Sequence, residues 1–416
     1  MEIARKIAAN VQALLDNNNV SITDISNYLE VSRQTMTNYL KASSTLDSVQ
    51  LVKLADYFNV PVSELIKDND TDASQPAMLF RSAVHYDEAV SQIETLIRNY
   101  WQEYLHLAKE TGSNICFLPE QYNLSVDTGG TVVDINFECK DFFSSKLKID
   151  DTLRNDIWQI ADTQRRLLGI EGKGAIDLIP ALTSRGINVL FLDMQTTDIF
   201  GLSICDEEKG CFIFVNTNSN ITIERQLFTI AHEYGHCVLH RPIFRRKIPK
   251  ESGKQSKTSI LDAMADEFAG RLLCNPSDLA LYKEQFNTTH EDIASIIQIA
   301  MPIKKRLQIS LQSLMMGLKK YGFISAHTLN DFYALLRRTG STTNEPASIS
   351  SDFFLINRYE AEKRAQILHM LRILYRRGKL KNNDLTYFLG CTEDEAQKYI
   401  AVFDSELYAL KNVFSE

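Results

Sequence analysis

The pentapeptide His232-Glu233-Tyr234-Gly235-His236 combines residue types and a spacing that can do chemistry. Two histidines four residues apart leave a helix on the same face, about one turn apart, so both imidazoles can bind one metal ion. Glu233 stands beside them, where a carboxylate can act on a water molecule held by the metal. The pattern predicts a zinc hydrolase site, and the alternative is an ordinary helix that carries polar residues.

A zinc site of this kind needs a third protein ligand and an open fourth position. The best candidate is Asp262, in the run Leu261–Ala269, whose apolar residues have helical spacing. Asp266 follows one turn later and is expected to accept the free N–H of a ligating histidine. Glu267 is the rival third ligand. His240 is expected to pack or to support the site rather than to bind metal, and Cys237 is expected to be a buried filler.

Several elements must hold these residues in place. The apolar residues around the motif have the spacing of a half-buried helix; they are Phe228, Ile230, Ala231, Val238 and Leu239. We predict strands near 187–193, 199–204 and 211–216, and a helix after Thr152. Residues 244–258 are rich in lysine and arginine, which fits either a basic lid or, more simply, a solvated loop.

The runs Arg225–His240 and Ala265–Pro276 resemble the ImmA/IrrE metallopeptidases, and pieces at 176–189, 200–203 and 214–216 agree. The resemblance implies an α+β zincin-like domain that cleaves transcriptional repressors in stress or mobile-element responses. In that family the third ligand is usually a glutamate at the position of Asp262. Because aspartate is one methylene shorter, the second helix must come closer, and the affinity for zinc or the identity of the metal is open.

The N-terminus resembles the XRE-type helix-turn-helix modules of phage repressors. Residues 22–29 and 33–40 read as two helices, with Ser32 capping the second, and the module is expected to hold five helices. The residues expected to face the major groove are Arg33, Gln34, Thr35 and Asn38. Residues 1–70 carry six basic and nine acidic side chains, a net charge of −3. This is unusual for a DNA-binding domain, so a helical interaction or dimerisation module is the alternative.

Composition narrows the class of protein. The chain has 416 residues, is 44% hydrophobic and carries a net charge of −8, which argues against a general affinity for nucleic acid or anionic membranes. No secretory signal precedes the first helix, and no apolar run approaches the length of a membrane span. The seven cysteines are odd in number and scattered, so we expect reduced thiols in a cytoplasmic protein.

We therefore predict a multidomain, mainly α protein with a small β-sheet. The expected parts are a helix-turn-helix domain (1–67), a connecting region with a long packing or dimerisation helix (68–151), a metallopeptidase domain (152–340) and a helical C-terminal region (341–416). A polar linker is expected at 67–77, and homodimers are possible.

Two functions fit these observations. In the first, Zn²⁺ bound by His232, His236 and Asp262 activates water, Glu233 is the general base, and a repressor or other regulatory protein is cleaved. In the second, the chain is a DNA-binding regulator whose metal domain is a sensor that cleaves nothing. Glu233 favours the first, since a purely structural zinc site does not need a carboxylate beside an open metal position.

Overall fold

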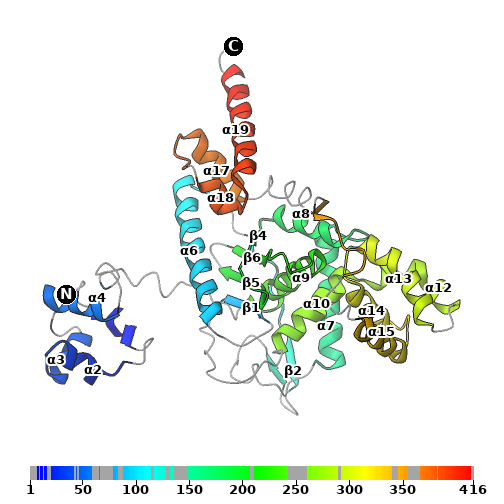
Figure 1. Cartoon of the computed structure of the whole chain (residues 1–416), viewed down its shortest axis with the longest axis horizontal. Coiled ribbons are helices and arrows are strands. Elements are labelled where there is room, and N and C mark those ends of the chain that lie inside the picture. The colour runs from blue at the N-terminus through cyan, green and yellow to red at the C-terminus, as the bar shows by residue number, and fades with distance from the viewer. Residues whose placement is uncertain are drawn as a thin grey trace. The chain divides into compact units, whose positions relative to one another are not determined.

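The computed structural model divides into two compact units, Met1–Gln75 and Pro76–Glu416, and each is described by itself (Figure 1). The residues that it describes are 7–8, 10–12, 14–15, 20–41, 44, 46–58, 65, 78–82, 88–113, 117–127, 132–134, 149–206, 210–241, 260–288, 292–339, 345–351, 353–354, 366–381 and 383–413. The expected linker at 67–77 and the basic segment at 244–258 lie outside them.

The first unit is helical. Helices α2 (Ile22–Tyr28) and α3 (Arg33–Leu40) begin at Ser21 and Ser32, whose hydroxyls each accept a hydrogen bond from a backbone N–H of the first turn. Helix α4 spans Ser48–Phe58. The predicted helices and the Ser32 cap are confirmed to within two residues. Apolar residues of this unit form a core of their own; its buried members include Val11, Ile25, Leu29, Met36 and Leu54.

The second unit is built around a four-stranded sheet in the order β1-β5-β6-β4. Strands β5 (Ile199–Asp206) and β6 (Gly210–Asn216) form an antiparallel hairpin, and β4 (Asn188–Leu192) joins β6 in parallel. These strands were predicted. The edge strand β1 (Met78–Ser82), which pairs with β5, was not predicted, because its partner lies more than a hundred residues away in sequence.

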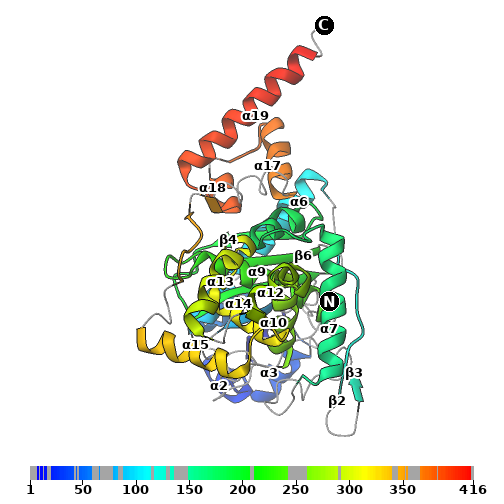
Figure 2. The ribbon, with the colours of Figure 1, turned by 90° about the vertical axis from the view of Figure 1, so that its right-hand side faces the viewer.

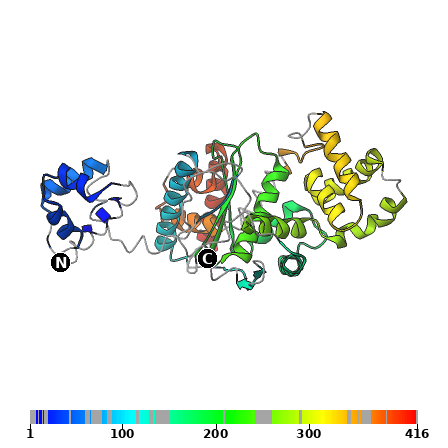
Figure 3. The ribbon, with the colours of Figure 1, turned by 90° about the horizontal axis from the view of Figure 1, so that it is seen from below.

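Helices cover both faces of this sheet (Figure 3). On one face lie α9 (Ile223–Leu239) and α10 (Ile260–Leu273), with the core of the metal site. On the other face, α6 (Glu88–Thr111) packs Trp101 and Tyr104 edge-on against Phe212 of β6. Helices α17 (Gln366–Arg376), α18 (Asp384–Leu389) and α19 (Glu393–Val413) share that second core.

The long helix of the connecting region and the C-terminal helices thus cover the same sheet as the metal site. The sequence divided this part of the chain into three regions, whereas the structure packs them into one compact unit. The two sheet faces explain why β6 is buried along its whole length. A strand covered on both faces carries a continuous apolar run instead of an alternating one.

The remaining helices of this unit share the core of α9 and α10 and contact these two helices or one another. Helix α7 (Asp151–Leu168) begins at Asp150, whose carboxylate accepts from Leu153 N, and ends at Gly169 in the left-handed conformation. The two-stranded pair β2 (Ser125–Asp127) and β3 (Val132–Asp134) lies beside α7 (Figure 2). The other elements are η2 (Ala175–Asp177), α8 (Leu178–Thr183), α11 (Pro276–Leu279), η4 (Ala280–Tyr282), α12 (Lys283–Thr288), α13 (Ile293–Leu307), α14 (Leu311–Lys320) and α15 (Ala326–Thr339).

A buried charged network fixes the start of α9. Lys304 of α13 is 1% exposed, and its Nζ lies 3.1 Å from Glu224 Oε1 and 3.3 Å from Glu345 Oε1. Glu224 also accepts hydrogen bonds from Ser348 Oγ and Ile349 N. Because a buried charge is tolerated only with such partners, the network specifies how α9, α13 and the segment from residue 345 pack together.

One expectation about the cysteines is wrong. Cys205 and Cys211 form a disulfide, with their Cα atoms 4.3 Å apart. The reason is the β5–β6 register, which places the two residues directly opposite each other. Cys237, Cys274 and Cys391 are thiols, as expected, while Cys116 and Cys139 lie outside the described residues.

Among the helices that can be described, none is both long and apolar enough to span a bilayer.

Candidate metal centre

Helix α9 carries the motif into the interior of the second unit. It begins at Thr222, whose hydroxyl accepts from Arg225 N, and runs without interruption through the motif. His232, Glu233 and His236 are each at most 1% exposed. Polar side chains buried to this extent need partners, so the contacts of each one indicate what it can do.

The three predicted ligands converge. His236 Nε2 lies 3.1 Å from His232 Nε2 and 3.6 Å from Asp262 Oδ1, and His232 Nε2 lies 4.0 Å from that same oxygen. In a tetrahedral zinc site with bonds of about 2.0 to 2.2 Å, ligand atoms stand roughly 3.3 to 3.6 Å apart. The residues present therefore fit a zinc ion, with shifts of a few tenths of an ångström. Two imidazoles and one carboxylate leave a fourth position for a reactant.

Close packing of the two helices brings Asp262 within reach. Gly235 of α9 faces α10, and a Cβ atom added to it would lie 3.0 Å from Phe268 Cδ1 and 3.4 Å from Ala265 Cα. A side chain at residue 235 would thus hold the helices apart. The glycine inside the motif thus lets α10 come close enough for the short side chain of Asp262 to reach the two histidines.

Each histidine of the pair has a partner on its other ring nitrogen. Asp266 Oδ1 lies 2.8 Å from His232 Nδ1, and His240 Nδ1 lies 2.8 Å from His236 Nδ1. These contacts direct both Nε2 atoms toward Asp262. His240 is fully buried, and burial lowers the pKa of its imidazole well below the usual range, with a further contribution from His236. A neutral His240 can accept a hydrogen bond from the Nδ1–H that His236 keeps when its Nε2 binds a metal.

Glu267, the alternative third ligand, makes its hydrogen bonds and ion pairs outside the histidine cluster. Its Oε2 accepts from Lys320 Nζ at 2.7 Å and from Trp158 Nε1 at 3.2 Å, and Arg154 Nε lies 3.5 Å from its Oε1. The ligand cluster that includes His232 and His236 contains Asp262 and not Glu267. A helix turns by about 100° per residue, so Asp262 and Glu267 lie on different sides of α10.

The sheet supplies a contact to Glu233 that sequence reasoning missed. Ser203 Oγ of β5 donates a hydrogen bond of 2.7 Å to Glu233 Oε2 in the buried interface between strand and helix. Gly201, two residues earlier on the same strand face, has no room for a side chain, since an added Cβ would lie 2.5 Å from Thr229 Cγ2. The sequence held two hints of this contact. One was the strand predicted at 199–204, and the other was the two-residue repeat that puts alternate side chains of a strand on one face. The pairing of β5 with α9 could not be read from one sequence.

The other residues of the motif region point elsewhere. Tyr234 is buried, and its hydroxyl donates a hydrogen bond of 2.6 Å to Gln164 Oε1 of α7. Burial raises the pKa of that hydroxyl, so it stays protonated and ties α9 to α7. Cys237 is fully buried, and burial raises the pKa of its thiol well above the usual range. Its sulfur faces Cys205 and Cys211 and is not part of the histidine cluster.

The predicted DNA-contacting residues lie on α3 in the first unit. Arg33 and Gln34 are exposed, and Thr35 and Asn38 are half-buried. Gln34 Nε2 donates to Asn38 Oδ1 at 3.2 Å, and Ser32 and Thr35 share a hydrogen bond of 2.7 Å between their hydroxyls. The four residues thus lie together on the second helix of a helix-turn-helix, the helix that enters the major groove in such domains.

Comparison with known families agrees with both parts. Residues 182–319 match the M78 peptidase family, described as an IrrE N-terminal-like domain, and residues 10–71 match a Cro/C1-type helix-turn-helix DNA-binding domain. A search of curated proteins and a search of solved structures found no match. The first match spans β4, β5, β6, α9 and α10, and with them every candidate metal-site residue. The chain therefore joins a Cro/C1-type helix-turn-helix domain to an IrrE-like peptidase domain, and M78 is a family of metallopeptidases.

Proposed function

We propose that this protein is a zinc-dependent endopeptidase. His232, His236 and Asp262 bind the zinc ion, and Glu233 is the catalytic residue. The observation that carries the proposal is the convergence of three ligand atoms from α9 and α10, all within 4.8 Å of one another, beside the buried Glu233 of α9. The peptidase family match supports the reaction class.

Each residue of the site has its own role in the proposed reaction. Zinc bound by the two imidazoles and Asp262 would polarise the scissile carbonyl and acidify a water molecule. Glu233 takes a proton from that water as it attacks and delivers it to the nitrogen of the leaving amine. Ser203 holds Glu233 Oε2. Asp266 and His240 hold the rings of His232 and His236, so that the ligands need little rearrangement during turnover.

The DNA-binding domain suggests where the peptidase acts. A Cro/C1-type domain works on DNA, so we place the protein in the cytoplasm and its substrate among transcriptional repressors or other regulatory proteins. Cleavage of such a protein would relieve repression in a stress or mobile-element response. Arg33, Gln34, Thr35 and Asn38 would direct the enzyme to its operator.

Metal analysis of the purified full chain tests the site. We expect about one zinc per chain in the wild type, and none after the double substitution His232→Ala, His236→Ala. Elemental analysis that finds no metal in the wild type, or the same amount in the double variant, overturns the metal site.

The biological role is tested by co-expression with repressors encoded in neighbouring genes. Wild-type protein should yield a shortened repressor and raise expression of a reporter under its control, and the Glu233→Gln variant should do neither. If Glu233→Gln raises the reporter as the wild type does, the metal domain is a sensor that cleaves nothing, and the peptidase function is wrong.

A further inference from the structure

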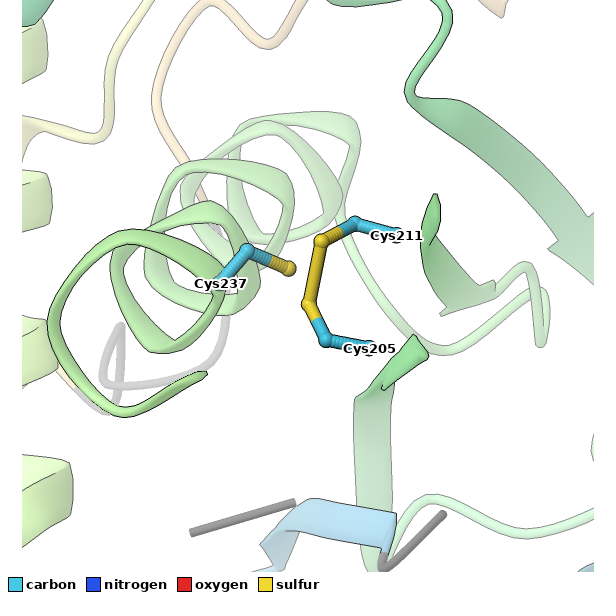
Figure 4. A group of neighbouring side chains, drawn as sticks. All are labelled: Cys205, Cys211 and Cys237. Carbon is cyan, nitrogen blue, oxygen red and sulfur yellow. A yellow bond between two sulfur atoms is a disulfide. The ribbon is translucent and has the colours of Figure 1, made fainter. Parts of the chain in front are cut away.

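Three sulfur atoms meet on the sheet face that packs against α9 (Figure 4). Cys205 of β5 and Cys211 of β6 form the disulfide, and the side chain of Cys237 points at it from α9. All three sulfur atoms lie within 4.8 Å of one another, and all three residues are at most 3% exposed. We call them the sulfur cluster.

The sulfur cluster is continuous with the contact that holds Glu233. Every second residue of β5 points toward α9, and every fourth residue of α9 points back at the strand. The facing pairs are Gly201 with Thr229, Ser203 with Glu233, and Cys205 with Cys237. The position of Cys205 therefore bears directly on Ser203, its neighbour on the same strand face.

Stabilisation of the fold explains little of this arrangement. The disulfide closes a separation of only six residues between strands that are already paired. A short loop of this kind restricts the unfolded chain least, because the entropy of loop closure grows with loop length. A structural cross-link also needs no third thiol in contact with it. A third thiol beside a disulfide is the arrangement that thiol–disulfide exchange requires.

We propose that the sulfur cluster is a reversible thiol–disulfide site, oxidised by small peroxides and reduced by dithiols, and that its oxidised state switches the peptidase site on. On oxidation, the thiols of Cys205 and Cys211 give two electrons and two protons to one hydrogen peroxide, which leaves one S–S bond and two water molecules. In exchange, Cys237 sulfur bonds to Cys205 sulfur, the Cys205–Cys211 bond breaks, and the proton passes from Cys237 to Cys211.

The switch rests on the proposed peptidase function, because its readout is the position of Glu233. The S–S bond fixes Cys205 against β6, and with it Ser203, whose hydroxyl holds the carboxylate of Glu233. Reduction leaves three thiols in a dry, closely packed interface without a covalent restraint. Two separate thiols need more room than one S–S bond, so reduction pushes Cys205 against Cys237 of α9 although β5 and β6 stay paired. The hydrogen bond from Ser203 to Glu233 is then weakened.

Mapping of the cysteine bonds tests the site without any assay of activity. The zinc-loaded full chain is treated with hydrogen peroxide or with a trialkylphosphine, and alkylated and disulfide-linked peptides are identified by mass spectrometry. We expect the Cys205–Cys211 bond after peroxide and neither residue linked after phosphine. In Cys211→Ser, peroxide should link Cys205 to Cys237, whereas Cys391→Ser should keep the wild-type bond. No Cys205–Cys237 bond in Cys211→Ser overturns the exchange.

Cleavage of a defined peptide pool then tests the switch. Oxidised wild type should cleave at least about fivefold faster than reduced wild type, and the ratio should fall to about one in the double variant Cys205→Ser, Cys211→Ser. Equal rates in the two states of the wild type overturn the switch and leave the peptidase standing. If neither state cleaves the peptides, both the peptidase function and the switch are contradicted. The sulfur exchange is then tested only by the mapping of the cysteine bonds.

Discussion

At the scale of single residues, the choice between two acidic side chains on α10 decides the metal site. Asp262 lies 3.6 Å from His236 Nε2, whereas Glu267 accepts hydrogen bonds from Lys320 and Trp158. We expect Asp262→Ala to lose zinc and Glu267→Gln to keep it, as measured by metal content after dialysis. The reverse pattern would make Glu267 the ligand and would mean that α10 sits differently from the structure described above.

Ser203 gives a second prediction at this scale. Ser203→Ala removes the 2.7 Å hydrogen bond to Glu233 Oε2 and leaves a buried carboxylate less well oriented. A hydrogen bond to a charged group contributes about 1.5 to 3 kcal/mol, so a loss of about tenfold or more in kcat is expected, with zinc content unchanged. Steady-state rates on a peptide pool measure it. An unchanged kcat would show that Ser203 does not position the general base.

At the scale of elements, the spacing of α9 and α10 is the critical quantity, and Gly235 sets it. Gly235→Ala places a methyl group 3.0 Å from Phe268 Cδ1, so Phe268 must give way by a few tenths of an ångström. Because that ring is fully buried, we expect α10 to move with it and to carry Asp262 away from the histidines. Overpacking of this kind costs about 1 to 3 kcal/mol, and zinc affinity should fall as well.

Gly270→Ala is the matched control for that substitution. Gly270 lies in α10, the partner helix of α9, and a Cβ added there meets nothing within 4 Å. The control should keep full zinc affinity and gain about 0.5 to 1 kcal/mol of stability, because alanine favours a helix over glycine. Denaturant unfolding and a zinc competition titration distinguish the two variants. If the two variants have the same zinc affinity and the same stability, the distance between α9 and α10 does not control zinc binding.

The elements also show how far the sequence could lead. Helical spacing predicted α9 and α10, and short apolar runs predicted β4, β5 and β6, because these signals are local. Contacts between distant segments were missed, namely the pairing of β1 with β5, Ser203 beside Glu233, and the Cys205–Cys211 bond. Each depends on which strand lies beside which strand or helix, and no periodicity in one sequence encodes that.

At the scale of the whole molecule, the two compact units lead to opposite expectations for two truncations. Removal of 1–75 leaves the second unit with both of its cores, so the fragment should fold and bind zinc as the full chain does. Removal of 366–416 strips α17, α18 and α19 from α6 and exposes apolar side chains such as that of Tyr100, which packs against Phe388 and donates a hydrogen bond to its carbonyl oxygen.

The second truncation should therefore yield an unfolded or aggregated protein, because the apolar surface that it exposes on the second core is too large to remain in contact with water. Circular dichroism and gel filtration of the two fragments provide the comparison. A soluble, folded and monomeric fragment 1–365 would mean that the rest of the second unit folds without the C-terminal helices.

The measurement that tests the central claim most directly is peptide cleavage by zinc-loaded wild type and Glu233→Gln, with metal content determined on the same samples. Glutamine keeps the size of Glu233 and can still meet Ser203 Oγ, but it cannot take a proton from water. We predict equal zinc in the two proteins, new amino termini in the peptide pool with the wild type, and a loss of cleavage of at least about a thousandfold in the variant. Cleavage by Glu233→Gln at the wild-type rate would contradict the account.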